Sequence, residues 1–286
     1  EYIADSLLKD KTFMLKALDT LVDYDLICTR SPHILIANAS ESLWKDKEFV
    51  IQALDIVGLL NIQLAIKNGE IYVLEANPRA SRTVPFVSKA TGVPIAKIAA
   101  KVMSGKTLKE LGMREQIPEQ VSVKEVVLPF SRLPGVDPCL GPEMKSTGEI
   151  MSTSDSFGRS YAKAQMAIGK PIPISGNAIV DLDSSEFPDP ESDHGRKLIE
   201  NFEEFFQIKH FDDEKDMREA IGNGEIDIII SRDRKILEIA VEERITYFST
   251  CSSAEAAIEA IRSEGESNCI EAVGDRKKRQ VQWGFS

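Results

Sequence analysis

The sequence has no long apolar run, few cysteines and no excess of positive charge. None of its apolar stretches reaches the roughly 20 residues that a membrane-spanning helix needs. Its 4 cysteines include no C-x-x-C pair, and none lies near a histidine at zinc-finger spacing, so we expect reduced structural thiols. The net charge of -11 and the lack of an amphipathic basic stretch disfavour nucleic-acid and membrane binding. We therefore expect a cytoplasmic protein.

The composition is that of an ordinary folded protein. Hydrophobic residues make up 42% and charged residues 28% of the 286 positions, which leaves room for two domains. Residues 181–243 contain 20 acidic and 8 basic residues, a charge run typical of a solvated surface. The first residues, EYIADSLLKDK, are too charged for a secretion signal and include no initiator Met. We therefore expect the chain to begin inside a longer one.

Helical and strand patterns are mixed over residues 1–170. Two short strands, 59–66 and 71–76, flank a turn that contains Gly69, and this arrangement predicts an antiparallel hairpin. Apolar spacing predicts helices and further strands around this hairpin. The expected helices are 7–22, 40–57, 85–90, 95–103, 105–111 and 156–168, and the expected strands are 26–28, 33–36 and 121–129.

Strands and helices alternate regularly after an expected linker at residues 171–174. The expected strands are 177–182, 206–211, 225–230 and 245–248, and the expected helices are 193–205, 213–221, 234–243 and 253–263. This order predicts a small parallel, Rossmann-like sheet covered by helices. We therefore predict an α/β chain, with an α+β portion over 1–170 and a parallel-sheet domain with a polar tail over 175–286.

Residues in and after the predicted hairpin are the main candidates for a binding site. Gln63 lies on one strand and Glu75 on the other, and Asn77 projects from the same strand face as Glu75. Amide and carboxylate oxygens of this kind suit Mg²⁺. Arg79 and Arg82 follow directly, and guanidinium groups can neutralise a metal-bound triphosphate. Spacing alone leaves open that these residues are only exposed or capping side chains.

Two longer stretches carry a family resemblance. GLLNIQLAIKNGEIYVLEANPRASRTVPFVSKATGVPIAKIAAKVMSGKTLKEL (58–111) and VSVKEVVLPFSRLPGVDPCLGPEMKSTGEIMS (121–152) strongly resemble the large subunit of carbamoyl-phosphate synthase. The resemblance implies the last part of an ATP-grasp site, within the half of an ATP-dependent carbon–nitrogen ligase that phosphorylates carbamate. It further implies that Gln63, Glu75 and Asn77 bind Mg²⁺ or Mn²⁺, that Arg82 contacts phosphate and that Arg79 lies beside it. The enzyme would be of the glutamine-hydrolysing or ammonia type and would serve arginine and pyrimidine biosynthesis.

Residues 176–262 resemble, more weakly, the methylglyoxal-synthase-like domain that ends this subunit and binds effectors. The family's threonine- and glycine-rich phosphate turn reads FDDEKDMRE here, residues 211–219, and its second phosphate loop reads SRDR, residues 231–234. Acidic side chains repel an anion. We therefore expect that this domain does not bind the family's effectors in the usual manner.

The family's glycine-rich nucleotide lid and adenine-binding hinge have no counterpart in residues 1–55, so the close resemblance is expected from Val57 onwards. The chain is then a fragment, one piece of a split subunit or a decayed copy, with little or no synthase activity alone. Its expected partner is the remaining portion of the large subunit and, indirectly, the glutaminase small subunit. The alternative is a non-catalytic regulatory or assembly protein derived from this subunit, which would not bind ATP.

Overall fold

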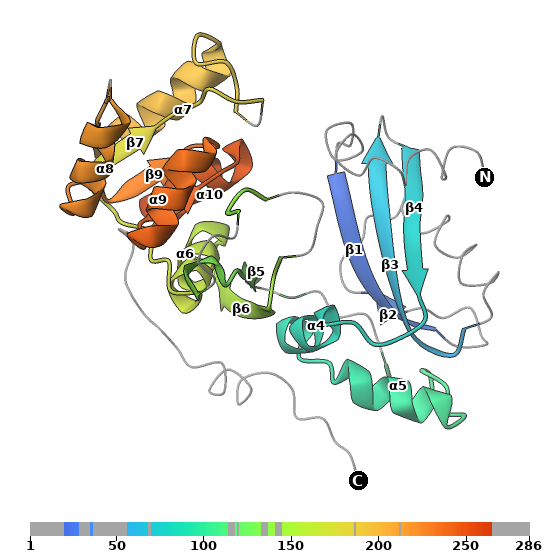
Figure 1. Cartoon of the computed structure of the whole chain (residues 1–286). Helices are drawn as coiled ribbons and strands as arrows, with labels where there is room; N and C mark the ends of the chain where they lie inside the picture. The colour runs from blue at the N-terminus through green and yellow to red at the C-terminus, as the bar shows by residue number, and fades with distance from the viewer. Residues whose placement is uncertain are drawn as a thin grey trace. The chain divides into compact units, whose positions relative to one another are not determined.

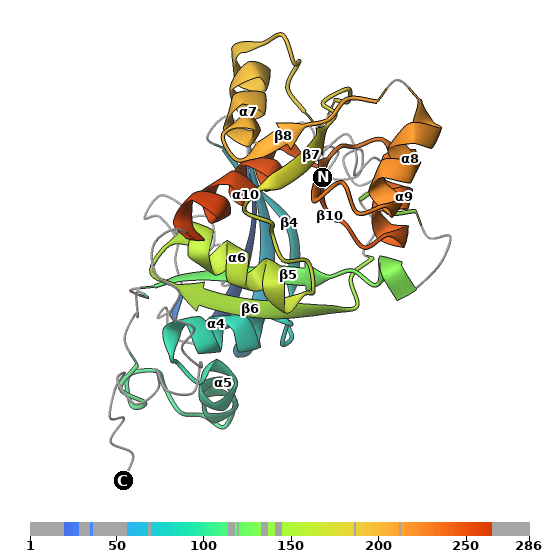
Figure 2. The same cartoon turned by 90° about the vertical axis from the view of Figure 1, so that its left-hand side faces the viewer.

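Antiparallel strands come first along the chain and a parallel sheet follows, as the computed structural model in Figures 1 and 2 shows. The structure describes residues 20–28, 35–36, 56–67, 70–113, 118, 120–132, 137–140, 145–185, 187–211 and 213–264. They fall into two compact units, divided between Glu119 and Gln120. This mixed architecture confirms the predicted α/β fold class. Within these described ranges, no helix is long and apolar enough to cross a membrane.

The first unit contains a four-stranded antiparallel sheet in the order β2-β1-β3-β4. Its strands are β1 (Thr20–Cys28), β2 (Leu35–Ile36), β3 (Gly58–Lys67) and β4 (Glu70–Asn77). The pairing of β3 with β4 confirms the predicted hairpin. Two helices follow, α4 (Thr83–Thr91) and α5 (Ile95–Met103), and Figure 1 shows them at the end of the sheet where β4 ends.

The helix predicted over residues 7–22 is wrong at its carboxyl end, where the chain is already in β1. Val22, Tyr24 and Leu26 alternate with Asp23 and Asp25, which is the two-residue period of a strand. The whole of β1 pairs with β3, and this ladder overrides the weaker helical spacing of the leucines before it. Residues 7–19, and residues 40–55 of the helix expected at 40–57, lie outside the described residues. Ile56 and Val57 are described and are not helical, so that helix is wrong at its carboxyl end.

A small apolar core holds α4 and α5 in place. Gly92 ends α4 with a left-handed φ of 74°, a conformation that glycine adopts without strain, and Pro94 directly precedes α5. Buried side chains from both helices pack against Val57 and Leu59 at the start of β3. The helical turn or two expected over 105–111 is limited to turns, in which the Leu111 N–H donates to the Thr107 carbonyl at 3.1 Å. The buried members of this core are Val84, Val93, Ile95, Ile98, Val102 and Leu108.

The second unit begins with an antiparallel hairpin that supports one helix. The hairpin consists of β5 (Val121–Val127) and β6 (Gly148–Ser154), and α6 (Phe157–Ala167) lies against it (Figure 2). A short 3-10 helix, η2 (Phe130–Arg132), follows β5. The strand β6 was not predicted, because GEIMSTS has few of the apolar residues that mark a strand.

A parallel sheet in the order β10-β9-β7-β8 forms the rest of the second unit. Its strands are β7 (Gly176–Val180), β8 (Phe206–Ile208), β9 (Ile228–Ile230) and β10 (Thr246–Phe248). The helices are α7 (Asp193–Glu203), α8 (Glu214–Gly222), α9 (Arg234–Glu242) and α10 (Cys251–Glu264). The predicted strand–helix alternation is therefore confirmed over this segment.

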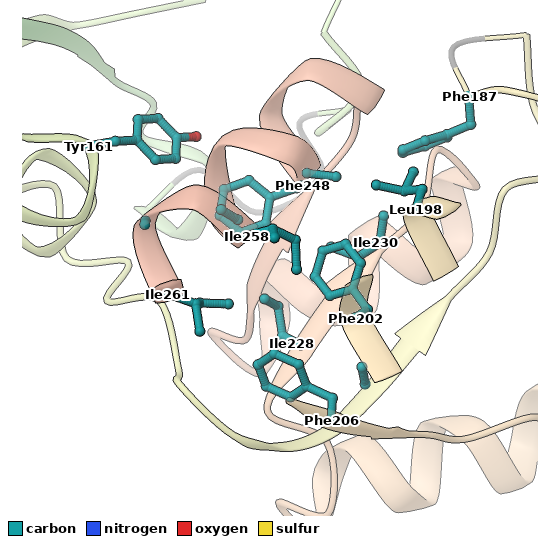
Figure 3. Packing of buried hydrophobic residues seen from close by; sticks show 14 of the residues in the cluster. Tyr161, Phe187, Leu198, Phe202, Phe206, Ile228, Ile230, Phe248, Ile258 and Ile261 are labelled. Carbon is teal, nitrogen blue, oxygen red and sulfur yellow. The ribbon is translucent and has the colours of Figure 1, made fainter. Parts of the chain in front are cut away.

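The central strand β9 contributes to two cores on opposite faces of the sheet. Ile228 and Ile230 pack with α7 and α10, whereas Ile229 packs with α8 and α9. All three are fully buried, as expected of a parallel strand covered on both faces. Tyr161 of α6 belongs to the first core, part of which is drawn in Figure 3. The helix α6 therefore packs into the core on one face of the parallel sheet. The domain division at 171–174 stays a prediction.

Gly158 is required where α6 crosses α10. A Cβ at this position would meet the main-chain carbonyl of Glu259, with its carbonyl carbon at 2.9 Å. Gly158→Ala is therefore expected to lower the free energy of unfolding by about 1–3 kcal/mol, despite the better helix propensity of alanine. Urea unfolding followed by circular dichroism measures this change.

Gly222, the last residue of α8, provides the matched control, because an added Cβ there meets nothing within 4 Å. Gly222→Ala is expected to leave stability unchanged or to raise it by about 0.4–1 kcal/mol. Equal effects of the two substitutions would contradict the close approach of α6 to α10.

Candidate functional site

Four polar residues meet on two neighbouring strands of the first unit. Gln63 of β3 pairs directly with Glu75 of β4, and Asn61 pairs with Asn77. Directly opposed residues of an antiparallel pair project from the same sheet face, and so do residues two apart on one strand. The regular pairing breaks between Gln63 and Leu64, and such irregularities occur often beside active sites.

Glu75 and Asn77 are in direct contact through their side chains. The Asn77 amide nitrogen donates a hydrogen bond to Glu75 Oε1 at 2.8 Å. This bond leaves the Asn77 amide oxygen and the second Glu75 oxygen as the atoms that could bind a cation. Glu75 is exposed, whereas Gln63 and Asn77 are half-buried, so the carboxylate lies at the edge that solvent reaches. The assignment of the three residues as metal ligands stays a prediction.

Asn61 is the member of this group that sequence reasoning missed. It is 4% exposed and stands opposite Asn77. The signal was present, since Asn61 precedes Gln63 by two residues on a strand and must share its face. An amide there extends the row of polar oxygens along the hairpin.

Both predicted arginines lie on the connection between β4 and α4. Arg79 donates its main-chain N–H to the Asn77 carbonyl at 2.8 Å, which turns the chain sharply after the strand. Arg82 directly precedes α4, and the Ser81 hydroxyl accepts the Thr83 N–H at 3.0 Å, so the helix begins there. Both guanidinium-bearing residues are exposed. The amino-terminal end of a helix also favours a phosphate.

The loops at the expected effector site are occupied by carboxylates. Asp233 caps α9 by accepting the N–H groups of Lys235 and Ile236 at 2.8 and 3.0 Å. The Ser231 hydroxyl donates to Asp181 at 2.7 Å. The amides that a phosphate would need are therefore bound to a side chain of the same loop. The expectation that the usual effectors are not bound here stays a prediction.

A half-buried pair of charged residues lies in the second unit, near β10. Lys170 places its Nζ 3.9 Å from the centre of the Tyr247 ring. Burial lowers the pKa of Lys170 to about 8, although the nearby charge of Glu125 opposes the shift. Burial also raises the pKa of Glu125, which accepts a hydrogen bond from Gln165 at 3.0 Å. Because these side chains lie within the packed unit, we interpret the group as structural.

The depressed pKa of Lys170 predicts how stability depends on pH. The unfolded chain keeps this proton up to a pH of about 10.5 and the folded chain releases it near 8, so the unfolded chain binds more protons in between. The free energy of unfolding is therefore expected to rise by about 2 kcal/mol between pH 7 and 9.5. Above that pH the raised pKa of Tyr247, about 12, acts in the opposite direction.

Urea unfolding at several pH values tests this prediction. Lys170→Met is expected to flatten the profile, whereas Lys197→Gln, at an exposed position on α7, keeps the rise. A wild-type stability that is constant or falls over this range would show that Lys170 is not desolvated.

Comparisons with known proteins agree with the geometry. The chain matches the family model described as "Carbamoyl-phosphate synthase L chain, ATP binding domain" over residues 22–111, which include all five predicted site residues. The carbamoyl phosphate synthase large chain of Halobacterium salinarum is 52% identical over 229 residues, 80% of this chain and 20% of that protein. The large chain of Archaeoglobus fulgidus is 44% identical over 254 residues, 78% of this chain and 22% of that protein.

A shorter relative covers a larger share of both sequences. The carbamoyl phosphate synthase large chain of Methanosarcina barkeri is 38% identical over 287 residues, 90% of this chain and 72% of that protein. By contrast, this chain spans about a fifth of the length of the Halobacterium and Archaeoglobus proteins. Among solved structures, N5-carboxyaminoimidazole ribonucleotide synthetase from Thermotoga maritima aligns with 53% of this chain and 51% of its own, at 13% identity and a TM-score of 0.39, a likeness too low to argue from.

Proposed function

The chain belongs to the carbamoyl phosphate synthase large chain family, and on that basis we propose that it forms the metal- and phosphate-binding end of a site that phosphorylates carbamate with ATP. The observation that carries the proposal is the pairing of Gln63 with Glu75, beside the contact between Glu75 and Asn77. These residues lie inside the segment that matches an ATP-binding domain. The activity would be that of an ATP-dependent carbon–nitrogen ligase.

The donor set of this site fits Mg²⁺ or Mn²⁺. Hard divalent cations prefer a few carboxylate and amide oxygens and take their remaining ligands from phosphates and water. Glu75 would supply the negative charge, and Gln63 and Asn77 would supply neutral oxygens. The hydrogen bond from Asn77 fixes the orientation of the Glu75 carboxylate. When bound, the cation would neutralise part of the negative charge of the ATP phosphates.

Arg79 and Arg82 would act on the phosphoryl group itself. Phosphoryl transfer spreads negative charge over the oxygens of the transferred group, so catalysis depends on positioning and charge neutralisation. A guanidinium presents several donors in one plane and can bind two phosphate oxygens at once. In this proposal Arg82 contacts the transferred phosphate and Arg79 neutralises charge beside it. A carbamate oxygen attacks the γ-phosphorus of ATP, the bond from that phosphorus to the bridging oxygen breaks, and ADP leaves to give carbamoyl phosphate.

The remaining parts of the proposal concern partners and regulation. The chain would work with the remaining portion of a large subunit, which supplies the adenine side of the site, and through it with a glutaminase subunit. The second unit would correspond to the family's methylglyoxal-synthase-like domain. Its capped loops favour a structural role over effector binding. The product would enter arginine and pyrimidine biosynthesis.

Isothermal titration with Mg-ATP tests the proposal. The chain alone is expected to bind weakly or not at all, because the adenine side of the site is not supplied. Addition of an N-terminal polypeptide carrying the rest of the synthase half is expected to restore binding. Absence of binding under both conditions would overturn the proposal and leave the non-catalytic regulatory or assembly role.

A further inference from the structure

Three potential metal ligands from two helices meet on the second unit. His194 lies in the first turn of α7, Cys251 is the first residue of α10, and Glu255 follows one turn later. The His194 Nε2 lies 2.8 Å from Glu255 Oε1 and 3.8 Å from Cys251 Sγ. One ligand atom from each of the three side chains lies within 4.8 Å of the other two. These residues belong to neither the ATP site nor the capped loops described above.

The helices that carry these ligands are held by a packed core. Cys251 and Glu255 share one face of α10 because they are four residues apart. Beneath them, Leu198 and Phe202 of α7 and Ile258 of α10 are at most 3% exposed and lie in one cluster, which Figure 3 shows.

A second contact fixes the same two helices further along. Arg262 of α10 donates to Asn201 of α7 at 2.8 Å and to Glu204 just after α7 at 2.9 Å. The backbone positions of all three ligands are therefore set by packing and ion pairing elsewhere on α7 and α10. Such preorganisation lowers the conformational cost of binding.

We propose that His194, Cys251 and Glu255 bind a transition-metal ion of the Zn²⁺ class. A thiolate, an imidazole and a carboxylate form the mixed set that Zn²⁺ and Co²⁺ accept, whereas Mg²⁺ and Ca²⁺ take oxygen ligands. Tetrahedral bonds of about 2.0–2.3 Å place neighbouring donors roughly 3.3–3.6 Å apart. The observed separations of 2.8 and 3.8 Å lie on either side of this range, so small side-chain rotations suffice.

The fourth position of such a site would face solvent. The side chains of His194 and Glu255 are 58% and 51% exposed, and Cys251 is half-buried. Water would complete a tetrahedral set, as in zinc sites with three protein ligands. The alternative is that His194 and Glu255 form an ordinary surface ion pair and that the Cys251 thiol plays no part in it. In that case no bond between sulfur and a metal forms.

Cobalt titration of the full chain separates the two readings. Co²⁺ bound to a thiolate gives a near-ultraviolet charge-transfer band, and four-coordination gives intense visible bands. Both are expected in the wild-type chain, and Zn²⁺ is expected to remove them by displacement. Cys251→Ser is expected to abolish the near-ultraviolet band. His194→Gln and Glu255→Gln should each weaken Co²⁺ binding at least about tenfold. Substitution of a residue that only hydrogen-bonds to a metal ligand already lowers metal affinity by about that factor.

The chain offers matched controls for each variant. Cys139→Ser removes the other described thiol, and Glu259→Gln removes an exposed carboxylate one turn further along α10; both are expected to keep the bands. Cys28→Ser and Cys269→Ser test the two remaining cysteines. Glu75→Gln should also leave the sulfur band unchanged, which separates this site from the ATP site.

A second readout does not depend on absorption. Zn²⁺ is expected to raise the melting temperature of the wild-type chain by a few degrees, and this rise should disappear in His194→Gln and Cys251→Ser. Circular dichroism confirms that each variant is folded. The proposal is overturned if no sulfur band forms with Co²⁺, or if the band persists in Cys251→Ser. Binding unaffected by both His194→Gln and Glu255→Gln would also overturn it.

Discussion

Glu75→Gln is expected to weaken the binding of Mn-ATP by about 30-fold or more, in the chain combined with the rest of its synthase half. A unit charge 4 Å from a divalent cation is worth about 2 kcal/mol even at the dielectric constant of water, and more in a partly dry site. The glutamine keeps the size of the side chain and an oxygen that can accept from Asn77, but an NH2 group replaces the second oxygen. The substitution therefore removes the charge and the metal-facing oxygen together, while leaving the shape of the hairpin. Titration calorimetry measures the affinity, and the magnetic resonance signal of free Mn²⁺ measures the metal directly.

Glu110→Gln is the matched control for this prediction. Glu110 is an exposed carboxylate of the same unit, and its hydrogen bonds from Thr107, at 2.8 and 3.1 Å, are ones that glutamine also accepts. Its replacement is expected to change Mn-ATP affinity by less than threefold. If Glu75→Gln has an equally small effect, Glu75 does not bind the metal, and the exposed carboxylate at the end of the hairpin has only a structural role.

The hairpin and its polar face could be predicted because their signals are local. The turn at Gly69 and the two-residue spacing of Glu75 and Asn77 are both contained in a short stretch of sequence. The register that places Gln63 opposite Glu75 is less local, since it depends on an irregularity after Gln63 that no residue pattern announces. Asn61 was missed for a simpler reason: the two-residue period was not extended backwards along β3.

The parallel sheet was predictable for a different reason. Ile228, Ile229 and Ile230 form a continuous apolar run, which is typical of a strand buried on both faces. Asp213 and Asp233 mark the starts of α8 and α9, which precede and follow this strand along the chain, and each caps its helix. The aspartates occur at these positions because each accepts a hydrogen bond from the first N–H groups of the helix that follows it.

The elements that could not be predicted depend on distant partners. The strand β6 pairs with β5 across a connection of 20 residues, and its own sequence is largely polar. His194 and Cys251 are 57 positions apart, so no sequence spacing could reveal a shared site. Their approach requires α7 and α10 to cover the same face of the sheet. The packing of α7 beside α10 follows from the spatial order of the strands in the sheet. The sequence of helices and strands along the chain does not determine that order.

Phe202→Ala is expected to cost about 3–5 kcal/mol of the free energy of unfolding, the largest effect on stability expected of any substitution considered above. Phe202 is fully buried between α7 and the sheet, and its ring lies 6.3 Å from that of Phe206 (Figure 3). Alanine would leave a cavity in a core whose helices are fixed at both ends and cannot easily collapse. A typical domain is stable by only about 5–15 kcal/mol, so much of the stability of this unit would be lost.

Phe157→Ala distinguishes burial from the loss of an aromatic ring. Phe157 stacks on Tyr161 at 5.7 Å, but it is 38% exposed, so its removal opens no closed cavity and is expected to cost about 1 kcal/mol. Urea unfolding gives both values, and hydrogen exchange locates them. In Phe202→Ala, amides of α7 and α10 should exchange at least about 100-fold faster, which corresponds to about 2.7 kcal/mol. Equal costs for the two phenylalanines would mean that the core beneath His194 and Cys251 is loosely packed, and the metal ligands would then have no rigid support.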